Sequence, residues 1–351
     1  MATVAYCTRE MVMAALDVAE VARNSAQVDR AIEAATDAIH GLLKRRFYPQ
    51  LATRYFDWPN HQYARPWRLW LDQDELISVS SLVAGGVTIP SNDYFLEPAN
   101  DGPPYTRIEV DLASSSAFAP GATHQRAVAV TGLFGYSADE DQVGDLTATL
   151  GATEGATGSA TWTTARIGVG AILRIDSERM IVTAKTMVDS TQNLGGAGLQ
   201  ASSSDVTVPV SGGAAFAVEE VLAIDSERML IVDKTGNNLT VKRAWDGTVL
   251  AAHSAGADVY TLTGVELDRG ELGTTIAAHS SGADIFRHRV PPLIRDLAVA
   301  ETINQLQQET AGYARVIGEG ETAREGTGRG LFDLRRDAVA RYGRRARSRA
   351  V

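Results

Sequence analysis

The feature that most constrains the fold is an internal repeat in the middle of the chain. The hexapeptide IDSERM occurs at residues 175–180 and again at residues 224–229, inside longer matching segments, AILRIDSERMIVTAK and EVLAIDSERMLIVDK. In both copies Ile, Leu and Val surround a polar centre, which is typical of two strands joined by a tight turn. Repeats on this scale are copied supersecondary units. The sequence therefore predicts a β-hairpin module that is present twice.

A second pair of similar segments follows the first. RAWDGTVLAAHSAGADVY (243–260) resembles RGELGTTIAAHSSGADIF (269–286), and each carries one histidine at the equivalent place. The surrounding stretch, 137–289, is rich in Gly, Ala, Ser and Thr, with short apolar segments between. We interpret it as a β-rich domain inserted into another fold.

Both ends of the chain show helical periodicity. Between residues 8 and 47 apolar side chains recur at three- and four-residue steps, and the segment after Pro292 repeats this pattern. Between the N-terminal helices and the insert lie short aromatic and β-branched segments separated by turn signals, which favour a small antiparallel sheet.

The predicted fold class is therefore α+β, with a helical core, a small antiparallel β element and a large β-rich insert of repeated hairpins. Four segments follow from this: 1–136, the N-terminal helices and small sheet; 137–289, the insert; 290–317, a C-terminal core helix; and 318–351, a flexible linker and basic arm.

Composition narrows the class of protein. Among 351 residues, 44% are hydrophobic and 22% are charged, as in ordinary soluble globular proteins. No apolar run approaches the roughly 20 residues that span a bilayer, and the N-terminus lacks the pattern of a signal peptide. A single cysteine, Cys7, excludes an internal disulfide.

The IDSERM carboxylates are the first candidates for chemistry. Asp176 and Glu178, like Asp225 and Glu227, stand two residues apart and would share one face of a strand. A glycan hydrolase could use such a pair. However, the sequence indicates no histidine or metal-ligand partner near either pair, and Asp and Ser favour turns. We therefore prefer a structural, turn-forming role.

Other catalytic patterns are also missing from the sequence. None of the histidines has a zinc-binding spacing; they are His40, His61, His124, His253, His279 and His288. Cys7 has no indicated base, and no nucleophile elbow or Walker motif occurs. We expect no catalytic residue, no metal site and no cofactor, and hence a protein that is not an enzyme.

One segment interleaves arginines with aromatic residues, in RRFYPQLATRYFDWP and RPWRLWL. Aromatic side chains in the sheet core are the first interpretation, a protein interface enriched in Tyr, Trp and Arg the second, and stacking of single-stranded nucleic acid the third. The interface candidates are Arg45, Arg46, Tyr48, Arg54, Trp58 and Trp67.

The C-terminus is basic although the whole chain carries a net charge of -10. This contrast suggests that the tail meets a negative partner, although a solvated end is the alternative. The residues of this candidate arm are Arg335, Arg336, Arg341, Tyr342, Arg344, Arg345, Arg347 and Arg349.

Several segments together resemble a known family. AIEAATDAIHGLLKRRFYP, TRYFDWP, RLWLDQDELISVSSLVAGG, DYFLEPANDGPPYTRIEV, AVAVTGLFGY and VPPLIRDLAVAETINQL are similar to the head-to-tail connector, or head-completion adaptor, proteins of long-tailed bacteriophages. The resemblance covers about 20–136 and 290–312. It rests on diffuse motifs, of which the basic-aromatic helix end and the VTGLFGY strand are the strongest. The insert, 137–289, departs from the short family members.

The resemblance implies a non-enzymatic virion protein located in the neck between capsid and tail and assembled in the host cytoplasm. Such a protein forms an oligomeric ring, usually of twelve copies, under the portal. The implied partners are other copies of the chain, the portal protein, the next neck or tail protein, and the packaged DNA that passes through the channel, with no membrane. It also implies that the basic arm reaches the portal or the DNA. A surface- or glycan-binding module in the insert is an alternative, and a glycan hydrolase is a less favoured one.

Overall fold

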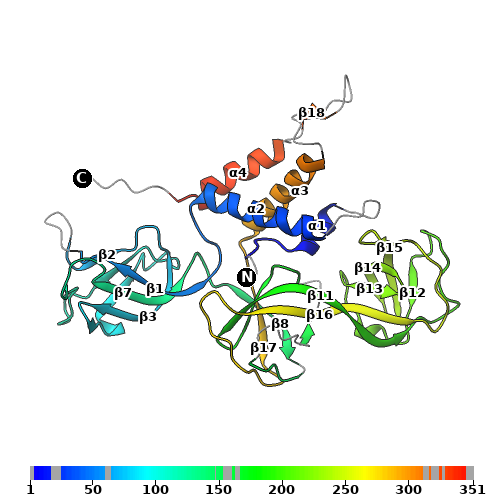
Figure 1. Ribbon diagram of the computed structural model, residues 1–351, viewed down its shortest axis with the longest axis horizontal. Coiled ribbons are helices and arrows are strands. Elements are labelled where there is room, and N and C mark those ends of the chain that lie inside the picture. The colour runs from blue at the N-terminus through cyan, green and yellow to red at the C-terminus, as the bar shows by residue number, and fades with distance from the viewer. Residues whose placement is uncertain are drawn as a thin grey trace.

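The computed structural model describes residues 4–16, 25–59, 65–146, 148–152, 160–162, 167–310, 316–317, 324–325 and 329–344. Helices and antiparallel sheets occur together, so the predicted mixed α+β class is confirmed. Figure 1 shows a group of helices above two β units that extend to opposite sides. In the described part of the chain, no helix has both the length and the apolarity to cross a bilayer.

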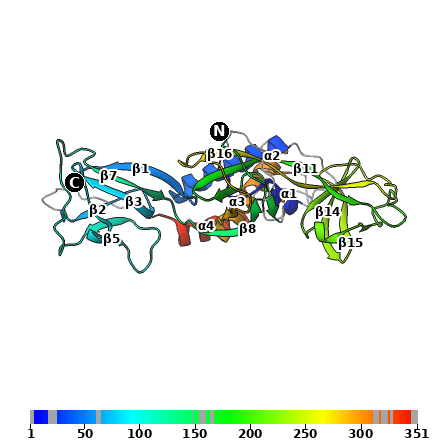
Figure 2. The same ribbon diagram turned by 90° about the horizontal axis from the view of Figure 1, so that it is seen from below.

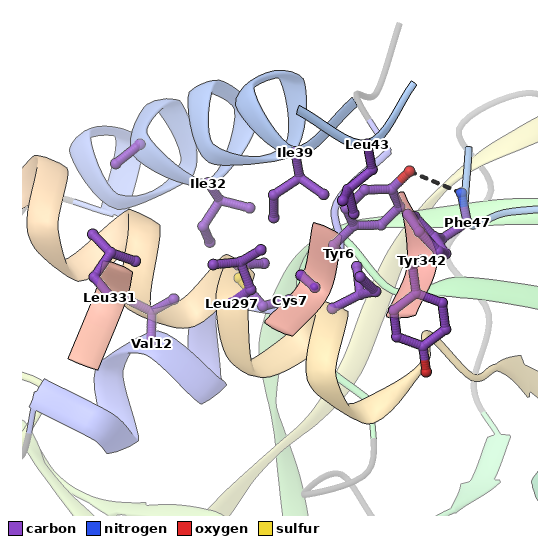
Figure 3. Close-up of a cluster of buried hydrophobic side chains, with 14 of the residues drawn as sticks. Tyr6, Cys7, Val12, Ile32, Ile39, Leu43, Phe47, Leu297, Leu331 and Tyr342 are labelled. Carbon is purple, nitrogen blue, oxygen red and sulfur yellow. Dashed lines mark hydrogen bonds between the residues drawn. The ribbon is translucent and has the colours of Figure 1, made fainter. Parts of the chain in front are cut away.

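The helical core is made from both ends of the chain. The N-terminal part supplies α1 (Arg9–Leu16) and α2 (Ser25–Leu43), and the C-terminal part supplies α3 (Pro292–Thr310) and α4 (Arg329–Tyr342). The buried stripe of α2 repeats at helical spacing and includes Val28, Ile32, Ala35, Ile39 and Leu43. It packs with buried residues of α3 and α4, as Figure 3 shows. Segments far apart in the sequence therefore share one apolar core.

Tyr6 fixes the start of the chain inside this core. Its ring is buried against Phe47, and its hydroxyl accepts a hydrogen bond of 2.9 Å from the backbone N–H of Phe47 (Figure 3). The side chain of Tyr6 also contacts His40 of α2. A buried tyrosine hydroxyl needs such partners, and these hold the segment before α1 against the end of α2.

The small β unit consists of two sheets around a separate core. One sheet has the order β1 (Gln50–Phe56), β7 (Val128–Phe134), β3 (Leu76–Ala84) and β4 (Val87–Thr88). The other has the order β2 (Arg68–Trp70), β6 (Arg107–Val110) and β5 (Tyr94–Glu97). Along β7, buried residues alternate with half-buried ones, as expected for a strand with one face in the core.

The third sheet is formed by strands from 140–288, the segment that the sequence analysis interpreted as an insert. Its order is β12 (Thr207–Pro209), β15 (Asn238–Trp245), β14 (Glu227–Thr235), β13 (Val221–Ile224), β16 (Asp258–Glu271), β11 (Glu178–Asn193), β10 (Ile172–Ile175), β17 (Asp284–His288), β8 (Glu140–Leu146) and β9 (Ala160–Trp162). β11 and β16 form a long two-stranded ribbon through its middle, from Arg179↔Glu271 to Asn193↔Asp258. The second IDSERM copy, at residues 224–229, lies in the chain between β11 and β16. The second hairpin module is therefore inserted into the first (Figures 1 and 2).

The nested arrangement leaves two apolar clusters in this sheet. One surrounds the first hairpin and includes Leu173, Met180 and Ile285, and the other surrounds the second and includes Leu222, Met229 and Val259. Each copy of the repeat therefore has its own core at one end of the ribbon.

The C-terminal helix corrects an expectation. The sequence predicts that 318–351 forms a flexible linker and a basic arm outside the helical core. Instead Leu331, Ala338 and Tyr342 are buried in the helical core, whereas Phe332 and Val339 are 68% and 43% exposed. An amphipathic helix buries its apolar stripe wherever a matching surface is within reach, and α3 and α2 provide that surface.

A charged substitution tests this packing of α4. Ala338→Glu places a carboxylate at a position with 0% exposure, where an unpaired charge is strongly unfavourable. We expect the midpoint of thermal unfolding to fall by several degrees. Ala340→Glu is the matched control, because Ala340 lies on the exposed side of the same helix. Equal melting temperatures for the two variants would show that α4 does not belong to the core.

Candidate functional site

The two IDSERM copies form hairpins with the same register. Ile175 pairs with Glu178 across the first turn, and Ile224 pairs with Glu227 across the second. The aspartate of each turn has a positive φ, 51° at Asp176 and 52° at Asp225. Aspartate tolerates this left-handed conformation better than most residues. The expected turn-forming role therefore fits the aspartates.

The glutamates are not turn residues, which corrects the sequence interpretation of these acids. The Glu178 side chain is 0% exposed and faces Arg269 of β16. Arg269 donates from Nε to one carboxylate oxygen at 2.8 Å and from Nη2 to the other at 2.5 Å. The backbone N–H groups of Gly270 and Ala277 donate to the same two oxygens at 3.0 and 2.9 Å. The buried charge is thus paired and hydrogen-bonded on both oxygens.

The second copy repeats this geometry with other residues. Arg243 of β15 donates to both oxygens of Glu227 at 2.7 and 2.8 Å. The N–H groups of Ala244 and Ala251 donate to them at 2.9 Å each. The guanidinium also donates to the carbonyl of Ala251 at 2.6 Å. Each repeat therefore contains one buried Glu–Arg pair on a backbone cradle.

A histidine completes each cluster, although the sequence indicated none nearby. His279 lies 2.8 Å from Asp176 through Nδ1 and 2.8 Å from Glu178 through Nε2. His253 lies 2.7 Å from Asp225 and 3.0 Å from Glu227 in the same way. Both ring nitrogens can donate only when the imidazole is doubly protonated. We call each set of Asp, Glu, Arg and His an ionic quartet.

The quartets change the acidity of their glutamates. Burial alone would raise the pKa of Glu178, but hydrogen bonds from Arg269, the backbone N–H groups and His279 outweigh it and lower the pKa to about 2. The same contacts in the second quartet lower the pKa of Glu227 to about 2. Both glutamates are therefore carboxylates at neutral pH.

The quartets are built to hold strands together. Both carboxylate oxygens of each glutamate accept hydrogen bonds, and neither glutamate side chain is exposed to solvent. Only the aspartates are open to solvent, with side-chain exposures of 64% at Asp176 and 65% at Asp225. A hydrolytic carboxylate pair needs both groups at the substrate. Each quartet instead ties a hairpin to a neighbouring strand of the sheet and to the loop that carries its histidine.

The interleaved arginines and aromatic residues lie around the small β unit. Arg45 pairs with Glu75 at 2.8 Å, Arg46 donates to Gln50 at 3.0 Å, and Arg54 pairs with Asp74. The aromatic candidates are partly buried: Tyr48 packs near Tyr6, and Trp58 and Trp67 pack against the core of the small β unit. The arginines lie together where α2 ends and β1 begins, apart from Trp58 and Trp67.

Part of the candidate arm belongs to α4 and is held by the rest of the protein. Arg335 donates to both oxygens of Glu301 on α3 at 2.5 and 2.7 Å, and Arg344 donates to the backbone carbonyls of Asp72 and Gln73. Tyr342 is buried against Phe47, while Arg336 is exposed beside Asp333, and Arg341 is exposed near the ring of Tyr342. The remaining candidates, Arg345, Arg347 and Arg349, lie outside the described residues.

Within the described residues, no group of three or more histidine, cysteine, aspartate or glutamate side chains is arranged to hold a metal ion. Comparison of the chain with protein-family models, with curated proteins and with solved structures finds no match.

Loss of one quartet carboxylate should destabilise the protein strongly. Glu227→Gln keeps the shape but leaves Arg243 buried without a counter-charge, which costs about 3–5 kcal/mol in comparable cases. We expect the free energy of unfolding, measured with denaturant, to fall by an amount of that order. Glu219→Gln, at an exposed position in the same module, is the control. A loss below about 1 kcal/mol, as for an exposed pair, would contradict the proposed role.

Acid should release both quartets in a defined range. A glutamate with a folded pKa of about 2, against an ordinary value of 4.5, stabilises the fold above pH 4.5. That contribution, about 3 kcal/mol for each site, is lost as the pH falls from 4.5 towards 2. The unfolding free energy of the wild type should drop steeply in this interval, and that of Glu227→Gln less so. Parallel pH curves for the two proteins would rule out this origin.

Proposed function

We propose that the chain is a structural adaptor of a bacteriophage neck, which forms a ring under the portal, extends the DNA channel and docks the next neck or tail protein. The observation that carries the proposal is the helical core closed by both chain ends, with a small β unit on one side and the long sheet on the other (Figure 1). The resemblance of 20–136 and 290–312 to head-to-tail connectors covers α2, α3 and the small β unit.

The geometry supports a building block better than a catalyst. In each acid pair that could have served hydrolysis, the glutamate is enclosed in a quartet, where it helps to hold strands together. Opposite flanks of the molecule are different surfaces, and a contact between unlike surfaces generates a closed ring when the rotation between copies closes. The nested sheet then lies at the side of each copy, where a decoration of the neck would project.

Direct imaging of the purified chain tests this proposal. We expect the protein, alone or mixed with a portal ring, to form closed rings in negative-stain electron microscopy, and to co-sediment with portal-bearing capsids. Capsids without the portal are the matched control. A chain that stays monomeric at high concentration and shows no preference for portal-bearing capsids would overturn the adaptor function.

A further inference from the structure

A hollow of about 340 Å³ lies where the helical core meets the small β unit. We call it the α2–β1 hollow. Its walls come from the end of α2, the start of β1, the loop before β3 and the end of β7. The charged residues that line it, apart from His40, are Lys44, Arg45, Arg46, Arg54, Asp74 and Glu75. Four cationic side chains thus face two carboxylates.

The carboxylates each take one arginine. Arg45 pairs with Glu75 at 2.8 Å and lies 5.0 Å from the ring centre of Tyr136. Arg54 pairs with Asp74 and lies 4.5 Å from the ring centre of Phe134. These contacts fix two guanidinium groups in the wall of the hollow and neutralise both acids.

The other two cations have no acidic partner among the described residues. Arg46 is exposed and donates only to the neutral amide of Gln50, at 3.0 Å, and Lys44 is exposed at the end of α2. The positive charge of Arg46 also acts on its neighbours. Burial lowers the pKa of both His40 and Arg54, and the charge of Arg46 lowers it further. The side chains that line the hollow therefore carry a net positive charge.

The positive charge continues beyond the hollow. Arg344, at the end of α4, binds the carbonyls of Asp72 and Gln73, and Gln73 itself lines the hollow. Burial lowers the pKa of Arg344, and the nearby carboxylates of Glu75 and Asp72 act in the opposite direction. Arg344 thus extends the row of cations, with part of its charge balanced by these two acids. A single carboxylate would contact only the hollow. A chain of regularly spaced anions, in contrast, can contact the hollow and Arg344 at the same time. Guanidinium and ammonium groups both suit phosphate oxygens.

We propose that the α2–β1 hollow binds a phosphate group of a nucleic-acid backbone, with Lys44 and Arg46 contacting the phosphate oxygens and Arg344 extending the contact to the next phosphate. This inference deepens the proposed adaptor function by naming where the chain meets DNA. Contacts to the backbone carry no sequence information, so binding is independent of base sequence.

Binding of a short duplex DNA by the full chain tests the hollow, with fluorescence anisotropy measured over a series of salt concentrations. The variant Lys44→Gln/Arg46→Gln removes the two unpaired cations at exposed positions, and circular dichroism checks its fold. Arg126→Gln/Arg289→Gln changes the net charge equally at exposed positions elsewhere. Inorganic phosphate and poly-glutamate serve as competitors.

We expect the hollow variant to bind DNA roughly tenfold more weakly, and the slope of log K against log salt to fall by about 2, since each phosphate contact contributes about 0.9. The control should bind like the wild type, and inorganic phosphate should compete. Equal losses in both variants, or poly-glutamate that competes as well as DNA of equal charge, would overturn the proposal.

The adaptor function and the DNA-binding hollow are tested by separate results. If rings form on the portal but the wild type does not bind DNA, the hollow proposal fails and the adaptor function stands. If DNA binding depends on Lys44 and Arg46 but no ring forms, the hollow stands and the adaptor function fails.

Discussion

The helical core forms only when the two ends of the chain meet. α2 cannot bury its stripe alone, and its partners, α3 and α4, come from the far end of the sequence. The entropy cost of closing so long a loop grows only with the logarithm of its length. Burial of apolar area, at about 25 cal/mol per Å², outweighs that cost. The chain between the ends can therefore lengthen without loss of the core, provided that it folds by itself.

The ionic quartets fix the pairing of strands in the intervening region. Its strands cross long sequence distances, and each quartet links a hairpin to a strand and to a histidine loop through bonds that only the correct register satisfies. A buried charge pair contributes little net stability compared with apolar packing. Its role here is to specify the strand register, because a shifted register would leave a buried arginine or glutamate without its partner. The same device appears twice because the module is nested in a copy of itself.

Much of the fold could be predicted from local patterns. The stripe of α2, the alternation in the strands and the turn signal at each IDSERM copy are periodic features of neighbouring residues. The first quartet could not be predicted in that way, because Arg269 and His279 are 91 and 101 residues from Glu178. The signal was nevertheless present: both repeated segments place an arginine and an AAH tripeptide after their IDSERM copy. The two repeats had to be considered together, as one unit.

Hydrogen exchange of the full chain measures most directly whether both ends share one core. The backbone amides of α2, α3 and α4 should exchange with the same opening free energy, because a single cooperative unit opens as a whole. α4 amides that exchange orders of magnitude faster than those of α2, under conditions where α2 and α3 stay protected, would contradict a core closed by both ends of the chain.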